Sequence, residues 1–226
     1  MKVLAIDSSS KSASVAVCED GNLVGEVFLN CGLTHSVTIM PSVEWLFSML
    51  GMKPSDLDLI AIAAGPGSFT GLRIGASVAK GLAFLSNIPC AAVSTLRALA
   101  QNLAHIDGII CAVMDARANQ VYNAIFKAEN GKIIRMTEDR ATLVPELCRE
   151  LCGYENVTLV GDGAGIVKET SEKTLSTAPE GLMYLRAGSI AAAAEECEKI
   201  PASELVPMYL KLPKAERERI EKNRKG

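Results

Sequence analysis

Three closely spaced glycines in segment 65–71 form the part of this chain best suited to phosphate chemistry. The segment follows the apolar run 59–64, which indicates a buried strand, and leads into a predicted helix over residues 70–85. Backbone N–H groups at the start of a helix carry partial positive charge and attract anions. A strand, a glycine-rich turn and a helix in this order are therefore typical of a phosphate-binding turn.

Neither of the two best-known nucleotide-binding motifs is complete in this segment. A dinucleotide fingerprint needs Gly-x-Gly-x-x-Gly and an acidic residue about 20 positions later. Here the third glycine comes one residue late, and segment 85–93 contains no carboxylate. A P-loop needs a lysine that reaches the phosphates, and this turn has none. The segment therefore predicts at most a damaged nucleotide loop.

Two aspartates could direct a magnesium ion, because each stands at the end of an apolar strand. Asp7 ends the run 3–6, and Asp115 ends the run 111–114. Neither is followed by a glycine that would let the backbone approach a phosphate, which favours the alternative role of capping a tight turn. The glycines after the run 157–160 leave two alternatives open, weak nucleotide binding or a simple backbone turn. The candidates for a degenerate nucleotide site are Asp7, Ser9, Asp115, Gly161 and Gly163.

A hydrolase triad could be drawn from Ser36, His35 and Asp7, since histidine is the usual general base near neutral pH. However, His35 and Ser36 are neighbours in the sequence. Ser36 is better placed as the N-cap of a helix that runs to Leu50. Hydrolase chemistry therefore receives little support from these residues.

The composition indicates a globular protein without a membrane span. The chain has 226 residues, and its 49% hydrophobic content suffices for one large or two small cores. Its apolar runs are shorter than the roughly 18 residues that a membrane helix needs. Met1-Lys2 leads directly into a strand, with no signal peptide. We therefore expect a cytoplasmic protein with reduced cysteines, in which Cys148 and Cys152 serve packing.

The charge balance argues against a protein that grips nucleic acid on its own. The net charge is −3 and aromatic residues make up 4% of the chain, so both phosphate neutralisation and base stacking would be weak. Basic residues gather only in segment 211–225, where glutamates alternate with them. This pattern favours a solvated terminal helix.

The predicted elements repeat once along the chain. In the first half, strands at 3–7, 12–17 and 23–29 precede a helix at 36–50, a strand at 59–64, a helix at 70–85 and a strand at 90–93. In the second half, strands at 111–115, 121–126 and 132–136 precede a helix at 145–152, a strand at 157–160 and a helix at 187–199. Two β-β-β-α-β-α units, each with an aspartate at the end of its first strand, are typical of the actin-like (RNase H-like, ASKHA) α/β fold. We expect domains at 1–100 and 101–199, with a C-terminal helix over about 200–226 that packs back on the first domain.

Two of these helices carry more apolar surface than one sheet-facing side requires. In the helix 70–85, one stripe consists of the small residues Gly71, Gly75, Ala79 and Ala83, and a second stripe consists of Ile74, Val78, Leu82 and Leu85. In the helix 36–50, Trp45 and Met49 lie off the side that Ile39 marks as facing the core. Burial within the domain and burial against a partner explain these patterns equally well.

The chain resembles the bacterial TsaB (YeaZ) family of tRNA threonylcarbamoyladenosine biosynthesis proteins. The resemblance rests chiefly on the segment Gly65 to Gly75, and it extends over essentially the whole length. The other matching segments are Ile6-Asp7-Ser8-Ser9, His35-Ser36 with Pro41, Asp115-Ala116-Arg117 with Val121-Tyr122, Gly161-Asp162-Gly163, and Val206-Pro207-Met208-Tyr209-Leu210. The chain departs from the family pattern at Val37, where an acidic residue is usual, and in a less charged turn after Arg117.

The resemblance implies a non-catalytic member of the actin-like fold. Its catalytic relative TsaD binds a metal through two histidines, and the matching positions here are Thr95 and Leu99. Threonine is a poor metal ligand and leucine is none, so the resemblance implies no metal site of this kind. It also implies no cofactor of the chain alone, with at most weak ATP or ADP binding within a complex.

The resemblance further implies that the chain supports threonylcarbamoyl transfer to the adenosine 3′ of the anticodon in tRNAs that read ANN codons. It would form a heterodimer with TsaD, with TsaE as an accessory ATPase, and it would reach tRNA only indirectly. The same helices could instead form a homodimer. The expected interface residues are Ile39, Trp45, Met49, Gly71, Ile74, Gly75, Val78, Ala79 and Leu82. The alternative function is a stand-alone actin-like ATP-binding enzyme or an M22-like peptidase.

Overall fold

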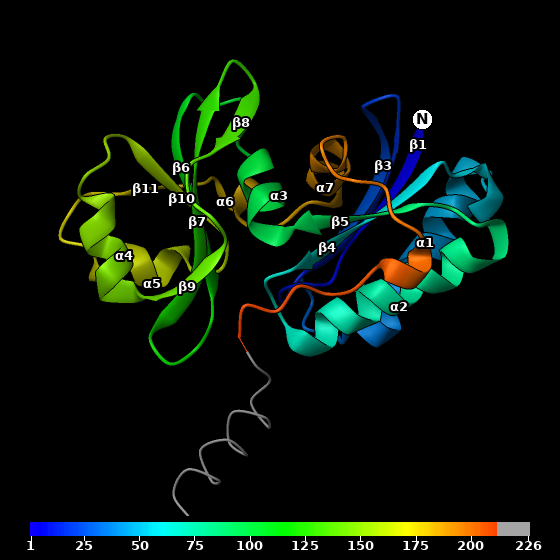
Figure 1. Ribbon diagram of the computed structural model, residues 1–226, viewed down its shortest axis with the longest axis horizontal. Coiled ribbons are helices and arrows are strands. Elements are labelled where there is room, and N and C mark those ends of the chain that lie inside the picture. The colour runs from blue at the N-terminus through cyan, green and yellow to red at the C-terminus, as the bar shows by residue number, and fades with distance from the viewer. Residues whose placement is uncertain (212–226) are drawn as a thin grey trace, which may run out of the picture.

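The computed structural model describes residues 1–211, with only the backbone of Leu85. The first of its two sheets has the strand order β3-β2-β1-β4-β5 (Figure 1). Strands β1, β2 and β3 form an antiparallel meander, and β4 and β5 extend it in parallel on the other side of β1. The strands are β1 (Lys2–Asp7), β2 (Ala13–Glu19), β3 (Asn22–Leu29), β4 (Leu59–Gly65) and β5 (Cys90–Ser94).

The second sheet repeats this order as β8-β7-β6-β10-β11, with β9 paired to β7. Its strands are β6 (Gly108–Asp115), β7 (Gln120–Glu129), β8 (Lys132–Arg135), β9 (Arg140–Leu143), β10 (Val157–Val160) and β11 (Ser176–Thr177). β6 and β10 occupy the places in the second sheet that β1 and β4 occupy in the first. In each sheet the strand that ends in an aspartate pairs in parallel with the strand that follows the next long helix. The expected actin-like α/β fold is confirmed.

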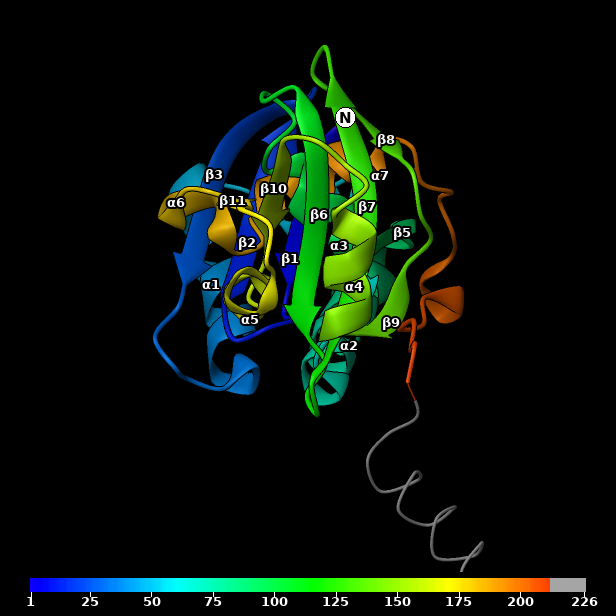
Figure 2. The same cartoon turned by 90° about the vertical axis from the view of Figure 1, so that its left-hand side faces the viewer.

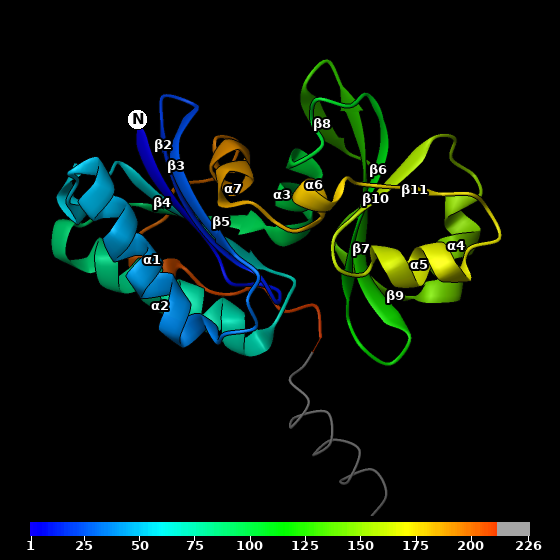
Figure 3. The same cartoon turned by 180° about the vertical axis from the view of Figure 1, so that it is seen from behind.

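Helices cover the outer face of each sheet. α1 (His35–Leu50) and α2 (Phe69–Ser86) lie side by side on the first sheet (Figure 3). α4 (Val144–Leu151) and α5 (Ala164–Thr170) lie on the second sheet (Figure 2). The side chains of β1 alternate accordingly, since Leu4 and Ile6 pack under α1 and α2 while Val3 and Ala5 face the other way.

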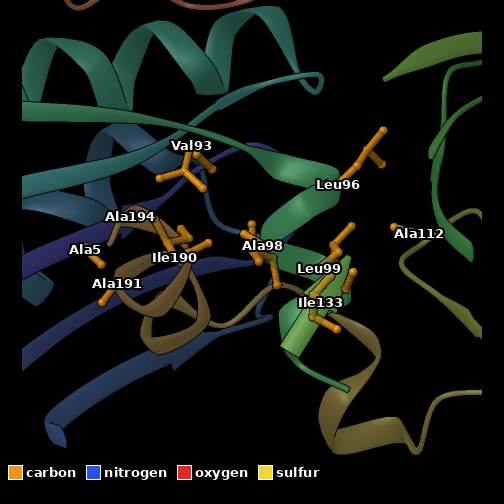
Figure 4. Packing of buried hydrophobic residues seen from close by; sticks show 14 of the residues in the cluster. Ala5, Val93, Leu96, Ala98, Leu99, Ala112, Ile133, Ile190, Ala191 and Ala194 are labelled. Atoms are coloured by element: carbon orange, nitrogen blue, oxygen red, sulfur yellow. The ribbon is translucent and has the colours of Figure 1, made fainter. Parts of the chain in front are cut away.

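Two further helices cross between the halves of the chain. α3 (Thr95–Gln101) follows β5 but packs on β6 of the second sheet, and α7 (Ala187–Ala194) follows the second sheet but packs on β1 and β2. Together they fill one core between the sheets, in which Ala5, Val93, Leu99, Ala112 and Ile190 belong to the same cluster (Figure 4). The predicted domain boundary near residue 100 stays a prediction. Each of these two helices packs on the sheet formed by the other half of the sequence.

A buried carboxylate holds α7 against the first sheet. Glu26 of β3 accepts hydrogen bonds from Arg186 at 2.5 and 2.9 Å and from the Gly188 amide at 3.0 Å. The Ala187 amide donates to Ser14 Oγ at 3.1 Å. A negative charge at the start of a helix is stabilising, because the free amide groups there carry partial positive charge.

Several local predictions were wrong. The N-cap of α1 is Thr34, and Ser36 lies within the first turn, its Oγ 3.2 Å from Thr34 Oγ1. The helix expected over 187–199 ends at Ala194, and β9, α5, β11 and the short helix α6 (Glu180–Met183) were not predicted. Short 3-10 turns occur at Pro54–Asp56 and Ala202–Glu204. Of the helix expected over 200–226, residues 200–211 form one of these turns and extended chain, and the remainder lies outside the described residues.

Candidate functional site

A cavity lies between the two sheets. The turns after β1, β4, β6 and β10 meet there, and segment 208–211 closes one side. The cavity has a volume of about 350 Å³. Its polar lining residues include Ser9, Ser10, Lys11, Ser68, Asp115, Arg117, Tyr122, Asp162, Tyr209 and Lys211. A mixed polar cavity between two domains is a common place for a ligand.

Asp7 caps the turn after β1 and is completely buried. Its Oδ1 accepts hydrogen bonds from the Ser9 amide at 2.8 Å and from Ser9 Oγ at 2.6 Å, whereas its Oδ2 has no partner among residues 1–211. Burial in low dielectric disfavours the charged form and raises the pKa of Asp7 to about 6, although the bonds from Ser9 oppose the shift. In the structure Asp7 therefore caps a tight turn through its side chain.

Asp115 makes the equivalent turn in the second domain. Its Oδ1 accepts from the Arg117 amide at 2.8 Å, two residues on as in the first turn, and its Oδ2 lies 3.2 Å from the Arg117 guanidinium. Asp162 approaches the same turn and accepts from the Asp115 amide at 3.0 Å. Burial raises the pKa of Asp162, and that hydrogen bond opposes the shift. Both aspartates at strand ends therefore serve the local backbone.

The glycines of the cavity allow backbone segments to approach one another. An added Cβ at Gly163 would lie 2.8 Å from the Val113 side chain, and one at Gly161 would lie 2.1 Å from the Val113 carbonyl. In the first domain an added Cβ at Gly67 would lie 2.5 Å from the Ser9 carbonyl. Gly161 also has φ 109°, a conformation that side chains rarely adopt. Close packing thus explains these glycines without a nucleotide.

Thr95 and Leu99, which the resemblance matched to metal ligands of TsaD, lie beside this cavity. Both side chains are buried, and the Thr95 hydroxyl has no hydrogen-bond partner in the part of the chain that the structure describes. Among residues 1–211, no group of three or more His, Cys, Asp or Glu side chains is arranged to hold a metal ion. Lys11 and Arg117 are exposed at the cavity and could attract an anionic ligand.

The residues proposed for a hydrolase triad do not bond to one another. His35 Nε2 lies 2.8 Å from the Ser10 carbonyl oxygen, and His35 Nδ1 is buried with no partner among the described residues. Ser36 Oγ pairs with Thr34. His35 therefore ties α1 to the turn after β1, and no nucleophile and base are brought together here.

A second candidate site is the outer face of α1 and α2. Trp45 and Met49 on α1 are 55% and 61% exposed, as expected for residues off the core-facing side. Ile74, Val78 and Leu82 on α2 are partly exposed. Val37 and Phe84, which the sequence analysis missed, are 56% and 82% exposed on the same two helices. We call these seven residues the outer helix face. Phe84 could have been found from its helical spacing to Ser77 and Gly81, two small residues that are exposed on the same side of α2.

The small-residue stripe of α2 faces inward, so the prediction that it lies against a partner is wrong. An added Cβ at Gly71 would lie 1.9 Å from the Ser8 carbonyl oxygen, and one at Gly75 would lie 2.4 Å from Ser8 Oγ. Ala79 and Ile39 are both fully buried in the core of the first domain. These four residues bring the helices close to the chain's own sheet and are not available to a second protein.

Comparison with known proteins identifies the family to which the chain belongs. A family model described as TsaD, tRNA N6-adenosine threonylcarbamoyltransferase, matches residues 30–217. The tRNA threonylcarbamoyladenosine biosynthesis protein TsaB of Bacillus subtilis is 34% identical over 228 residues, covering 98% of this chain and 99% of that protein. The chain belongs to the TsaB family.

Two other TsaB relatives agree with this assignment. TsaB of Escherichia coli is 37% identical over 152 residues, which is 66% of this chain and 65% of that protein. The solved structure of YeaZ from Pseudomonas aeruginosa superimposes with a TM-score of 0.79 at 26% identity, covering 92% of this chain and 99% of that one. The resemblance to the TsaB family is therefore confirmed over nearly the whole length of the chain.

Proposed function

We propose that this chain is a non-catalytic subunit that supports threonylcarbamoyl transfer to the adenosine 3′ of the anticodon in tRNAs reading ANN codons. It acts by forming a heterodimer with TsaD in the cytoplasm. TsaE binds the resulting complex as an accessory ATPase, and tRNA contacts the chain only indirectly. Membership of the TsaB family supports the role in tRNA threonylcarbamoyladenosine biosynthesis.

The observation that carries the proposal is the outer helix face. Exposed Trp, Phe and Met side chains on two adjacent helices leave apolar area in contact with water. Aromatic residues and Met are enriched at protein interfaces, and an exposed apolar patch of this kind marks a binding surface. A pair of helices that presents such a face fits a partner with a matching helix pair. TsaD matches this requirement, since the chain itself fits the TsaD family model.

The cavity between the domains supports the non-catalytic part of the proposal. Asp7, Asp115 and His35 are engaged in holding turns, as described above. Thr95 and Leu99 occupy the positions that would ligate a metal in TsaD. The chemistry would then belong to TsaD, and ATP or ADP would bind this chain at most weakly and within the complex. A homodimer through the same face is the competing use of these helices.

A charge placed on the outer helix face tests the proposal. The double variant Trp45→Glu, Met49→Glu should weaken binding to TsaD about 30-fold or more, because two desolvated apolar anchors become charged. Isothermal titration calorimetry with purified TsaD measures the affinity, and circular dichroism checks that the variant is folded. The substitution Gly75→Leu is not a suitable test, because the added side chain would meet Ser8 of the same chain.

A matched control is available on the edge strand of the second sheet. Ile134 on β8 is 48% exposed, and β8 lies far from α1 (Figure 1). Ile134→Glu places one negative charge on a similarly exposed apolar residue, where the double variant places two, and it should leave TsaD binding unchanged. Equal affinity of the double variant and the parent chain would overturn the proposed interface.

A further inference from the structure

The chain returns to the cavity after the last 3-10 turn. Leu205 is completely buried against the core of the first domain. Residues 206–211 then run as extended chain along α2 to the space between the two domains (Figure 1). Four of them, Met208 to Lys211, line the cavity. We call these four residues the strap.

The first half of the strap is attached to the first domain. The Met208 amide donates to the Ala64 carbonyl at 2.7 Å, beside the end of β4. An added Cβ at Gly65 would lie 2.1 Å from the Met208 carbonyl oxygen, so the strap and the glycine turn are in intimate contact. The Tyr209 ring lies 4.8 Å from that of Phe69, and its hydroxyl accepts from Arg73 Nε at 3.1 Å.

The second half of the strap is attached to the second domain. Lys211 Nζ donates to the Ala116 carbonyl at 3.1 Å and lies 5.4 Å from the centre of the Tyr122 ring. A cation over an aromatic face is a favourable contact. Ala116 and Tyr122 flank the turn between β6 and β7. Tyr209 and Lys211 are two residues apart in the chain, so the strap joins the element that carries Arg73 to the turn after β6.

The opposite side of the cavity is held by packing instead. α3 and α7 fill the core between the sheets there (Figure 4). Ser94 at the end of β5 donates to Asp139 at 2.5 Å, and Arg135 bonds to both of them. This side is a packed core, whereas the strap connects the two halves of the chain at the cavity. Closure of two domains about one fixed side is a common motion of two-domain proteins.

We propose that the strap is a clasp that holds the two domains closed over the cavity, and that its release opens the cavity. The clasp forms one wall of the closed cavity, so a ligand larger than the enclosed space must displace it to enter. The inference concerns the isolated chain and does not depend on the proposed partnership with TsaD.

Hydrogen exchange measured by mass spectrometry on the full chain tests the clasp. The double variant Tyr209→Ala, Lys211→Met removes the side-chain contact on each domain and keeps the buried Leu205. In this variant the turns at 8–11 and 116–120 should exchange about 10-fold faster than in the parent, because the cavity opens more often. The interiors of β1 and β6 should keep their protection. Val206→Ala is the matched control, since Val206 is 61% exposed beside the strap and does not line the cavity.

The single variant Lys211→Met tests whether the strap acts as a clasp between the domains or only stabilises the whole fold. It removes the side-chain attachment to the second domain and leaves the Tyr209 attachment intact, so it should accelerate exchange at the same two turns. Unchanged exchange at these turns in both variants would overturn the inference. Equal acceleration throughout β1 and β6 would also overturn it, because the strap would then stabilise the whole fold and not the closed state.

Discussion

At the scale of single residues, the two strand-end aspartates illustrate how a catalytic-looking residue can serve the backbone. Asp7 and Asp115 each accept a hydrogen bond from the amide two residues on. The turn chemistry of aspartate made this role predictable from the sequence. The burial of Asp7 was not predictable, because it depends on segments distant in the sequence that meet at the end of β1. Its effect on the pKa follows from that burial.

The pKa of Asp7 leads to a prediction about stability. Since the pKa is about 6 in the folded chain and its ordinary value is 3.8, the folded state binds the proton more tightly between these values. The contribution of Asp7 to the free energy of unfolding therefore falls as the pH rises from about 4 to about 6. Asp7→Asn keeps an oxygen for the Ser9 bonds and avoids the buried charge. It should be more stable than the parent by on the order of 1–3 kcal/mol at pH 7.5.

Thermal unfolding followed by circular dichroism at several pH values measures this effect. The advantage of Asp7→Asn should shrink as the pH is lowered from 6 to 4. Asp115→Asn is the control, since it breaks the ion pair with Arg117 on a side chain that is 24% exposed, and it should give no gain at pH 7.5. A stability difference for Asp7→Asn that does not change with pH would contradict the assignment.

At the scale of elements, α2 shows why an apolar pattern does not reveal what covers it. Its small residues recur every four positions, and the expectation was that they receive a partner helix. In the structure they receive the turn after β1 instead, with Gly71 and Gly75 against Ser8. The residues available to a partner are the larger ones on the next faces, among them Val78 and Phe84. The helix was predicted correctly and the assignment of one face was wrong.

A pair of glycine substitutions on α2 tests this packing. Gly71→Ala should lower the free energy of unfolding by about 3 kcal/mol or more, because its Cβ would overlap the Ser8 carbonyl, a backbone atom that cannot rotate away. Gly81→Ala on the same helix meets nothing within 4 Å and should raise stability by about 0.5–1 kcal/mol. Urea denaturation gives both values. Similar stabilities of the two variants would show that Gly71 does not pack as described.

At the scale of the whole molecule, exchanged helices make the two halves interdependent. α7 comes from the second half of the sequence and covers Val3 and Ala5 of the first sheet. α3 comes from the first half and packs on the second sheet. The described residues contain no helix long and apolar enough to cross a membrane. The internal repeat was visible in the sequence, but this exchange was not, since adjacency in the chain favours each helix packing on its own sheet.

The exchange predicts how fragments behave. A chain of residues 1–100 lacks α7 and exposes the inner face of its sheet, so it should not unfold cooperatively by circular dichroism. The full chain should show one cooperative transition, because the core between the sheets is shared. Mixing 1–100 with 101–226 should restore part of that transition. A cooperative transition of 1–100 alone would instead support an independent domain that ends near residue 100.

The sequence by itself determined the fold class, the order of most strands and the family. These features depend on local patterns, such as apolar strands that end in aspartate and the glycines of segment 65–71. Only the tertiary structure decided which faces are covered. It directed the Gly71 stripe inward, left Trp45 and Met49 in water, buried Asp7 and brought Lys211 to Ala116. The physical reason is that helical periodicity is the same whether a face meets its own sheet or another protein, and burial arises from contacts between residues distant in sequence.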